Sequence, residues 1–213
     1  MMIRVFIADD HQLFRDGLKR IFSVEDDISI AGEAANGFDA LELLHEDNWD
    51  IAILDVTLPN LNGLEVLKRI ITVNPKCKIL MLSMYHDDEY AFRALRIGAF
   101  AYLNKNSSAD LLITVIRRIN SGRKYIDPRI AEELIFNQNP KSDLTLHCLL
   151  SDREYEILRL ITEGVPLSKI SSCLSLSAKT VTTYRTRILE KMSMKTNAQL
   201  IRYAIENKLW DGK

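Results

Sequence analysis

The sequence predicts two domains of different class: an α/β domain with a parallel sheet between helices, and a smaller all-helical domain after it. Three observations lead to this prediction. In the first half, short apolar runs alternate with longer amphipathic stretches, as strands and helices do around a parallel sheet. Several of these runs end directly in polar residues. In the last third, apolar residues follow helical spacing and helix-capping residues precede them.

Four apolar runs of the first half are each followed directly by polar residues that could together form a ligand-binding site. The runs cover residues 3–8, 51–54, 79–82 and 101–104, and they are followed by Asp9, Asp10, Asp55, Ser83 and Lys105. In parallel sheets of this type, ligands bind beyond the carboxyl ends of the strands. We therefore expect these side chains to meet at one edge of the sheet.

The residue types indicate phosphoryl chemistry. Clustered carboxylates repel one another, and a hard cation such as Mg²⁺ relieves that repulsion through oxygen ligands. A lysine ammonium and a serine hydroxyl can stabilise the oxygens of a phosphoryl group. No residue of the set would activate water, so we expect a carboxylate nucleophile that accepts and keeps a phosphoryl group. Each residue alone has an ordinary structural role, such as a turn, a helix cap or a surface charge; their order along the chain favours the site.

The first half resembles the receiver domain of two-component response regulators. The resemblance runs through Ile-Ala-Asp-Asp-His at residues 7–11, Leu-Asp-Val-Thr-Leu-Pro-Asn-Leu-Asn-Gly at 54–63, Leu-Ser at 82–83 and Gly-Ala-Phe-Ala-Tyr-Leu-Asn-Lys at 98–105. It implies a flavodoxin-like fold with a five-stranded parallel sheet in the order 2-1-3-4-5. The sequence departs from many receivers in two places, with Asn106 in place of a proline and Met84 in place of a small residue.

The resemblance also implies a role for each site residue. Asp55 would be the phosphorylated aspartate. The Mg²⁺ ligands would be Asp10, Asp55, the backbone carbonyl of Thr57 and, through bound water, Asp9. Ser83 and Tyr102 would be the switch pair, whose rearrangement reports the phosphoryl group. Lys105 would be the phosphate-binding lysine.

Length and charge fit a modular protein. The chain has 213 residues and a formal net charge of -1, yet residues 149–213 carry 11 Lys/Arg against 7 Asp/Glu, and the remainder 17 against 22. An acidic first part suits metal binding and a basic second part suits nucleic acid. We expect a receiver domain at 1–122, a linker with a short helix at 123–148, and a helix-turn-helix domain at 149–213. Within the linker, residues 128–136 predict the helix and residues 137–145 a polar connection.

The chain carries no signal for export or for a membrane. No apolar run approaches the roughly 20 residues that a membrane-spanning helix needs, and the first 20 residues lack the apolar core of a signal peptide. We therefore expect a cytoplasmic protein without a membrane partner. The three cysteines, Cys77, Cys148 and Cys173, lack metal-ligand spacing and are expected to be reduced thiols.

Helix signals in the last third predict a helix-turn-helix. Ser151 and Glu154 have the spacing of a capping box, and Gly164 ends the helix that they begin. A short helix at 167–174 follows, and Ser177 caps a longer helix at 178–192. The second helix of such a pair can lie in the major groove of DNA. The alternative is a small helical bundle that makes protein contacts, with its charges as a solvated face.

This part resembles the LuxR-type output domain of NarL/FixJ-class response regulators, on residues 150–154, Leu158, Ile161, Gly164, 169–170, Leu174, 177–181, Ile188, 191–192 and 197–200. The resemblance implies that one group of residues occupies positions that often touch bases in the family. It implies that a second group lies nearer the DNA backbone. The first group is Thr182, Thr183 and Thr186, and the second is Lys179, Tyr184 and Arg187, with Lys191 adding positive charge. Thr182 and Tyr184 stand where the family commonly has lysine and histidine.

Together these observations predict a transcription regulator and not an enzyme. A sensor histidine kinase would phosphorylate Asp55, and phosphorylation would promote homodimerisation and binding to double-stranded promoter DNA. Two alternatives remain. One is a Mg²⁺-dependent aspartyl-phosphate phosphatase, which needs a second acid two residues after the nucleophile, where Thr57 stands. The other is a phosphorylation-controlled protein-interaction regulator, which would lack the steep salt dependence of DNA binding.

Overall fold

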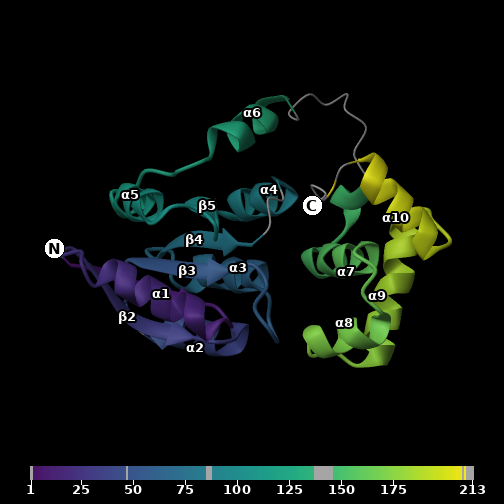
Figure 1. The fold of residues 1–213 in the computed structure, drawn as a ribbon, viewed down its shortest axis with the longest axis horizontal. Coiled ribbons are helices and arrows are strands. Elements are labelled where there is room, and N and C mark those ends of the chain that lie inside the picture. Colours follow the sequence, from purple (N-terminus) through teal and green to yellow (C-terminus); the bar gives the residue numbers. More distant parts are fainter. Residues whose placement is uncertain (1, 47, 85–87, 137–145, 208, 210–213) are drawn as a thin grey trace. The chain divides into compact units, whose positions relative to one another are not determined.

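The chain forms two compact units, Met1–Leu134 and Ile135–Lys213 (Figure 1). The structure is a computed structural model, and it describes all residues except 1, 47, 85–87, 137–145, 208 and 210–213. The polar connection predicted at 137–145 lies outside the described residues. No helix in the described part of the chain is long and apolar enough to cross a membrane.

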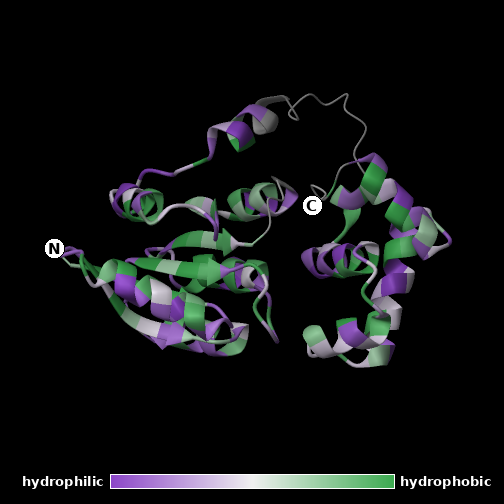
Figure 2. Cartoon of the chain, viewed as in Figure 1, coloured by the Kyte–Doolittle hydropathy of each residue, from purple (hydrophilic) through white to green (hydrophobic). Residues whose placement is uncertain are grey.

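A five-stranded parallel sheet forms the centre of the first unit, in the order β2-β1-β3-β4-β5, as predicted. The strands are β1 (Ile3–Ala8), β2 (Ile28–Ala34), β3 (Ile51–Asp55), β4 (Lys78–Ser83) and β5 (Ala101–Asn104). The central strand β3 is buried along its whole length, which explains why its sequence is a continuous apolar run and not an alternating one. In Figure 2 the strands are accordingly coloured as largely hydrophobic.

The helices that connect and follow the strands are α1 (Gln12–Phe22), α2 (Gly37–Glu46), α3 (Gly63–Val73), α4 (Asp88–Ile97) and α5 (Ala109–Asn120). A further helix, α6 (Pro128–Phe136), follows α5 in the chain. Helices α1 and α5 cover one face, where their apolar stripes pack on the odd-numbered residues of β1 and β3 and on matching positions of the other strands. Helices α2, α3 and α4 are neighbours in that order and lie against the other face. Both helix–sheet layers therefore have their own core.

The second unit is helical throughout its described residues. It contains a 3-10 turn η1 (Leu146–Leu149), which the sequence did not predict, and then α7 (Asp152–Thr162), α8 (Leu167–Cys173), α9 (Ala178–Lys191) and α10 (Asn197–Glu206). The predicted capping box is present: Ser151 accepts from the backbone N–H of Glu154, and the Glu154 carboxylate accepts from the backbone N–H of Ser151. Ser177 caps α9, as predicted. The core is apolar and is formed chiefly by Tyr155, Leu158, Val181, Ile188 and Leu200.

A close backbone approach requires glycine at the start of α3. The Gly63 N–H donates to the carbonyl of Val56 at 3.0 Å, which folds the loop after β3 back onto the strand. A Cβ at Gly63 would lie 2.0 Å from the backbone oxygen of Asp55, so no side chain fits there without moving the loop. This loop therefore has little freedom to adjust.

Gly63→Ala and Gly17→Ala should change the stability of the first unit in opposite directions. We expect Gly63→Ala to lower the free energy of unfolding by about 2 kcal/mol or more, because the backbone must move to admit the methyl group. Gly17 lies inside α1, and a Cβ added there would meet no atom of the packed surroundings within 4 Å. Its replacement by alanine should raise the free energy of unfolding by about 0.5 to 1 kcal/mol. Urea unfolding followed through the buried Trp49 measures both, and equal effects would contradict the assigned role of Gly63.

Candidate phosphoacceptor site and DNA-binding helix

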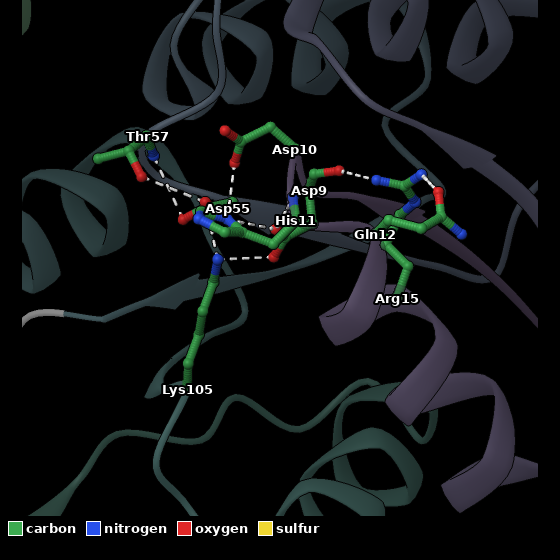
Figure 3. A network of polar contacts seen from close by, with 8 residues as sticks. All are labelled: Asp9, Asp10, His11, Gln12, Arg15, Asp55, Thr57 and Lys105. Carbon is green, nitrogen blue, oxygen red and sulfur yellow. Dashed lines mark hydrogen bonds and ion pairs between the residues drawn. The ribbon is translucent and has the colours of Figure 1, made fainter. Parts of the chain in front are cut away.

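The carboxyl-terminal edge of the sheet brings together two buried carboxylates and one buried lysine (Figure 3). Asp9 follows β1, Asp55 ends β3, and Lys105 follows β5. The Lys105 Nζ lies 2.6 Å from Asp9 Oδ2 and 2.8 Å from Asp55 Oδ2, and each of the three side chains is at most 2% exposed. A single ammonium thus faces two carboxylates away from water, so negative charge at this edge exceeds positive charge.

Burial controls the protonation of this group. Burial raises the pKa of Asp55; the Lys105 ammonium opposes this effect, the charge of Asp9 adds to it, and the pKa stays above its usual range. For Lys105, burial by itself would lower the pKa, but the carboxylates of Asp55 and Asp9 outweigh that effect and raise it. The ammonium therefore stays charged, and a further cation beside Asp55 would favour its ionised form.

Asp10 and His11 form the outer rim of the site. The Asp10 side chain is 39% exposed, and the His11 Nδ1 lies 2.9 Å from Asp10 Oδ1 and 3.2 Å from Asp9 Oδ1. The His11 backbone N–H also donates to Asp9 Oδ1 at 2.9 Å. Ligand atoms of Asp9, Asp10, His11 and Asp55 lie within 4.8 Å of one another. Asp10 is thus the partly exposed carboxylate of the set, and the His11 imidazole contacts both Asp9 and Asp10.

Thr57 fixes the orientation of the Asp55 carboxylate. Its backbone N–H donates to Asp55 Oδ1 at 3.3 Å and its hydroxyl donates to Oδ2 at 3.2 Å. The loop that holds Thr57 is fixed by Asn60, which has a φ of 67°, and by Asn62, whose side chain caps α3. Asp55 therefore has a neutral hydroxyl beside it where a second acid would stand in a phosphatase.

Ser83 and Tyr102 lie on the other side of the sheet from the carboxylates. Met81 pairs with Tyr102 in the ladder, and Ser83 shares the Met81 side of β4 because side chains alternate along a strand. That side is the one against which α3 packs, since a Cβ on Gly63 would touch Met81. Ser83 and Tyr102 are both buried, and Met84, the next residue, is exposed. The predicted site residues thus divide between the two faces of the sheet.

Arg15 is a site residue that the sequence analysis missed. Its Nη1 donates to the backbone carbonyl of Asp9 at 2.6 Å and its Nη2 to the side chain of Gln12 (Figure 3). Its Nε donates to Glu33 Oε2 on β2 at 3.2 Å. The guanidinium is almost fully buried. The sequence does contain a signal for this role, because Arg15 lies on the same buried side of α1 as Leu18. A buried charge in such a position requires hydrogen-bond or ion-pair partners.

In the second unit, the exposed face of α9 carries most of the predicted DNA contacts. One shallow depression is lined by Lys179, Thr182, Thr183, Thr186, Arg187 and Glu190. The three threonine hydroxyls donate to the carbonyls four residues earlier, at 2.9 to 3.1 Å, so their methyl groups and oxygen lone pairs are presented outward. Tyr184 is half-buried, with the Arg187 guanidinium 6.0 Å from its ring centre.

Lys191 has a different environment from the other predicted DNA contacts. Its Nζ lies 2.5 Å from Glu154 Oε2, the carboxylate of the α7 capping box. Glu154 is buried, and although burial favours its neutral form, Lys191 and the Ser151 N–H outweigh that effect and lower its pKa. Lys191 therefore links the end of α9 to the start of α7.

Comparison with known proteins gives two family matches. Residues 5–117 match the response regulator receiver domain, and residues 149–204 match the bacterial regulatory proteins of the luxR family. Among curated proteins, the chain is 35% identical to oxygen regulatory protein NreC of Staphylococcus carnosus, covering 98% of this chain and all of NreC. It is 34% identical to response regulator GacA of Pseudomonas protegens, covering 99% of each.

Solved structures agree with these matches. A LuxR-family two-component response regulator from Aurantimonas sp. SI85-9A1 is 30% identical, with a TM-score of 0.60, over 65% of this chain and 99% of that one. RcsB of Salmonella typhimurium, at 21% identity, shares the fold over 96% of this chain and 98% of its own, with a TM-score of 0.69. The chain therefore belongs to the two-component response regulators of the NarL/FixJ class, with a receiver domain followed by a LuxR-type helix-turn-helix domain.

Proposed function

We propose that this protein is a transcription regulator whose DNA binding is controlled by phosphorylation of Asp55 by a sensor histidine kinase in the cytoplasm. The observation that carries the proposal is the pairing of Lys105 with Asp9 and Asp55 at the sheet edge. A lysine in this position can neutralise a phosphoryl group attached to Asp55. The proposed domain limits are 1–122 for the receiver, 123–148 for the linker and 149–213 for the DNA-binding domain; the family matches support the first and third.

The donor set fits Mg²⁺, the ion expected of receiver domains. The proposed ligands are Asp10, Asp55, the backbone carbonyl of Thr57 and, through water, Asp9. Three of these groups are carboxylates whose ligand atoms lie close together with an excess of negative charge, and the Asp10 side chain is partly exposed to solvent. When bound, Mg²⁺ supplies positive charge that keeps Asp55 ionised and offsets the charge of the phosphoryl oxygens.

The residues of the chain then account for the transfer. A carboxylate oxygen of Asp55 attacks phosphorus, the new O–P bond forms, and the P–N bond of the kinase phosphohistidine breaks with the imidazole as leaving group. The two donors of Thr57 hold the carboxylate in one orientation. Lys105 exchanges its contact with Asp55 for one with the phosphoryl oxygens. Thr57, which lies beside Asp55, cannot act as a general base for water. This favours a stable phosphoacceptor over the phosphatase alternative.

Phosphorylation would reach the surface through Ser83 and Tyr102. Both are buried on the α3 side of the sheet, across from Asp9 and Lys105. A hydroxyl of Ser83 drawn toward the phosphoryl group leaves space into which Tyr102 can move, so the two side chains report the state of Asp55. We propose that this change promotes homodimerisation, because a two-state receiver acts by favouring one assembly over another.

DNA binding is assigned to α9. We propose that Thr182, Thr183 and Thr186 contact bases, and that Lys179, Tyr184 and Arg187 contact the DNA backbone. Lys191 contributes positive charge from its place beside Glu154. The luxR-family match and the solved RcsB–DNA complex, whose fold this chain shares, favour DNA over a protein-only partner.

Asp55→Asn should abolish labelling by a small-molecule phosphodonor in Mg²⁺, because an amide cannot attack phosphorus. Phosphate-affinity electrophoresis measures the labelling. Asp50→Asn changes a carboxylate at the opposite end of β3, which accepts from the Arg4 backbone N–H; it is the control and should label normally. Labelling of the Asp55 variant at the level of the unsubstituted protein would remove the phosphoacceptor assignment.

Arg15→Gln should weaken Mg²⁺ binding about tenfold, because the Asp9 carbonyl loses the donor that positions the acidic turn. Arg15→Lys should be intermediate, since it keeps the charge but not the three-way fork of donors. Arg20→Gln, on the exposed side of the same helix, is the control. Titration calorimetry measures the affinity; a folded Arg15→Gln protein with unchanged Mg²⁺ affinity would show that Arg15 is only a packing residue.

Arg187→Ala should weaken DNA binding equally on the best and worst sites and reduce the salt slope by about 1, as loss of a phosphate contact does. Thr183→Ala should instead change the preference between related sites, because a base contact is lost. Fluorescence anisotropy over a salt series with several duplexes measures both. A change in sequence preference alone for Arg187→Ala would reverse the two assignments.

A further inference from the structure

The first unit carries a second surface feature, a groove between α2 and α3 with a volume of about 780 Å³. Its apolar lining includes Phe38, Leu41 and Val73. Phe38 is 56% exposed and Val73 52% exposed, so an aromatic ring and a branched aliphatic side chain lie open beside the groove. None of these residues takes part in the phosphoacceptor site. Exposed apolar grooves of this kind mark interaction surfaces.

The two sides of the groove carry opposite charges. Glu42 and Glu46 line it from α2, one helical turn apart, while Lys68 and Arg69 line it from α3. Lys68 pairs with Glu65 of its own helix at 3.2 Å. Within the described residues, Glu42, Glu46 and Arg69 make no ion pair. A partner for this groove must therefore present basic groups to α2 and acidic groups to α3.

A second copy of this chain meets that requirement. Helices α2 and α3 each lead from one parallel strand back to the start of the next, so they run side by side in the same direction. A twofold axis parallel to them places each α2 over the α3 of the other copy, with glutamates against basic side chains in two identical seams. A twofold axis across the helices would place glutamates against glutamates. The charges thus select one of the two arrangements.

We propose that this groove is a homotypic docking surface, at which the α2–α3 pairs of two copies form a four-helix bundle. Phe38, Leu41 and Val73 of both copies would form its core, and Glu42 and Arg69 would pair across each seam. Each copy contributes only three apolar side chains to the core, so we expect a dimer of the weak and transient class. It uses no residue of the phosphoacceptor site, so it forms without phosphorylation and does not depend on the function proposed above.

The test is sedimentation equilibrium of the full chain carrying Asp55→Asn, which excludes any phosphorylation-dependent dimer. We expect a dimer that increases with protein concentration. Glu42→Lys or Arg69→Glu alone should raise the dissociation constant about tenfold, because the symmetry places each change in both seams. Phe38→Ser should raise it as well through loss of the core. Asp26→Lys, an exposed acid in the turn before β2, is the matched control and should have no effect.

Mixing separates this proposal from a nonspecific charge effect. An equimolar mixture of the Glu42→Lys and Arg69→Glu proteins should form a heterodimer about as tight as the dimer of the unreversed protein, since both seams again join opposite charges. The double variant should recover likewise. Three results would each overturn the proposal: a monomer at every concentration, single variants that match the control, or a mixture without recovery. The first result would indicate that the groove binds a different protein.

Discussion

The receiver unit depends on one electrostatic constraint: two carboxylates and one ammonium are buried together where the strands end. Asp9 and Asp55 come from β1 and β3, which are adjacent in the sheet, and the strand order reverses at this point. Lys105 comes from β5, two strands away from β3, and its long side chain spans that distance. Burying such charges costs free energy that hydrophobic residues would not cost. This cost is explained by the binding of a ligand: two buried carboxylates facing one ammonium leave excess negative charge, which favours binding of a cation.

The same constraint extends into α1 and β2. Asp9 is held through its side chain by Lys105 and through its backbone carbonyl by Arg15, and Arg15 is in turn paired with Glu33. Lys19 also pairs with Glu33, at 2.7 Å, and lowers its pKa together with Arg15, in opposition to the effect of burial. Charges of alternating sign thus run from the acidic turn after β1 to the surface of α1. The turn is therefore fixed by side chains as well as by backbone bonds.

The second unit separates stability from recognition. Three of its helices begin with a side chain that accepts from the backbone, and two of these caps are complete capping boxes. Val181, Ile188 and Met192 turn one side of α9 into the core, while its other side carries threonines and basic residues. Lys191 ties the end of α9 to the start of α7, since its ammonium pairs with Glu154, the carboxylate of the α7 capping box. Substitutions on the outer threonines are thus expected to act on binding without affecting the core.

Sequence by itself determined the features that depend on neighbours along the chain. It predicted where β1 and β5 begin and end, the Ser151 and Ser177 caps, and the polar residues at the ends of β1, β3, β4 and β5, because periodicity, capping and strand ends are local. Tertiary structure alone decided which distant groups meet: Arg15 with the Asp9 carbonyl, Lys191 with Glu154, and Ser83 with Tyr102 on one face. It also brought Phe38 and Val73 to one groove. Such pairings depend on how helices pack on the sheet and on each other, which no local pattern encodes.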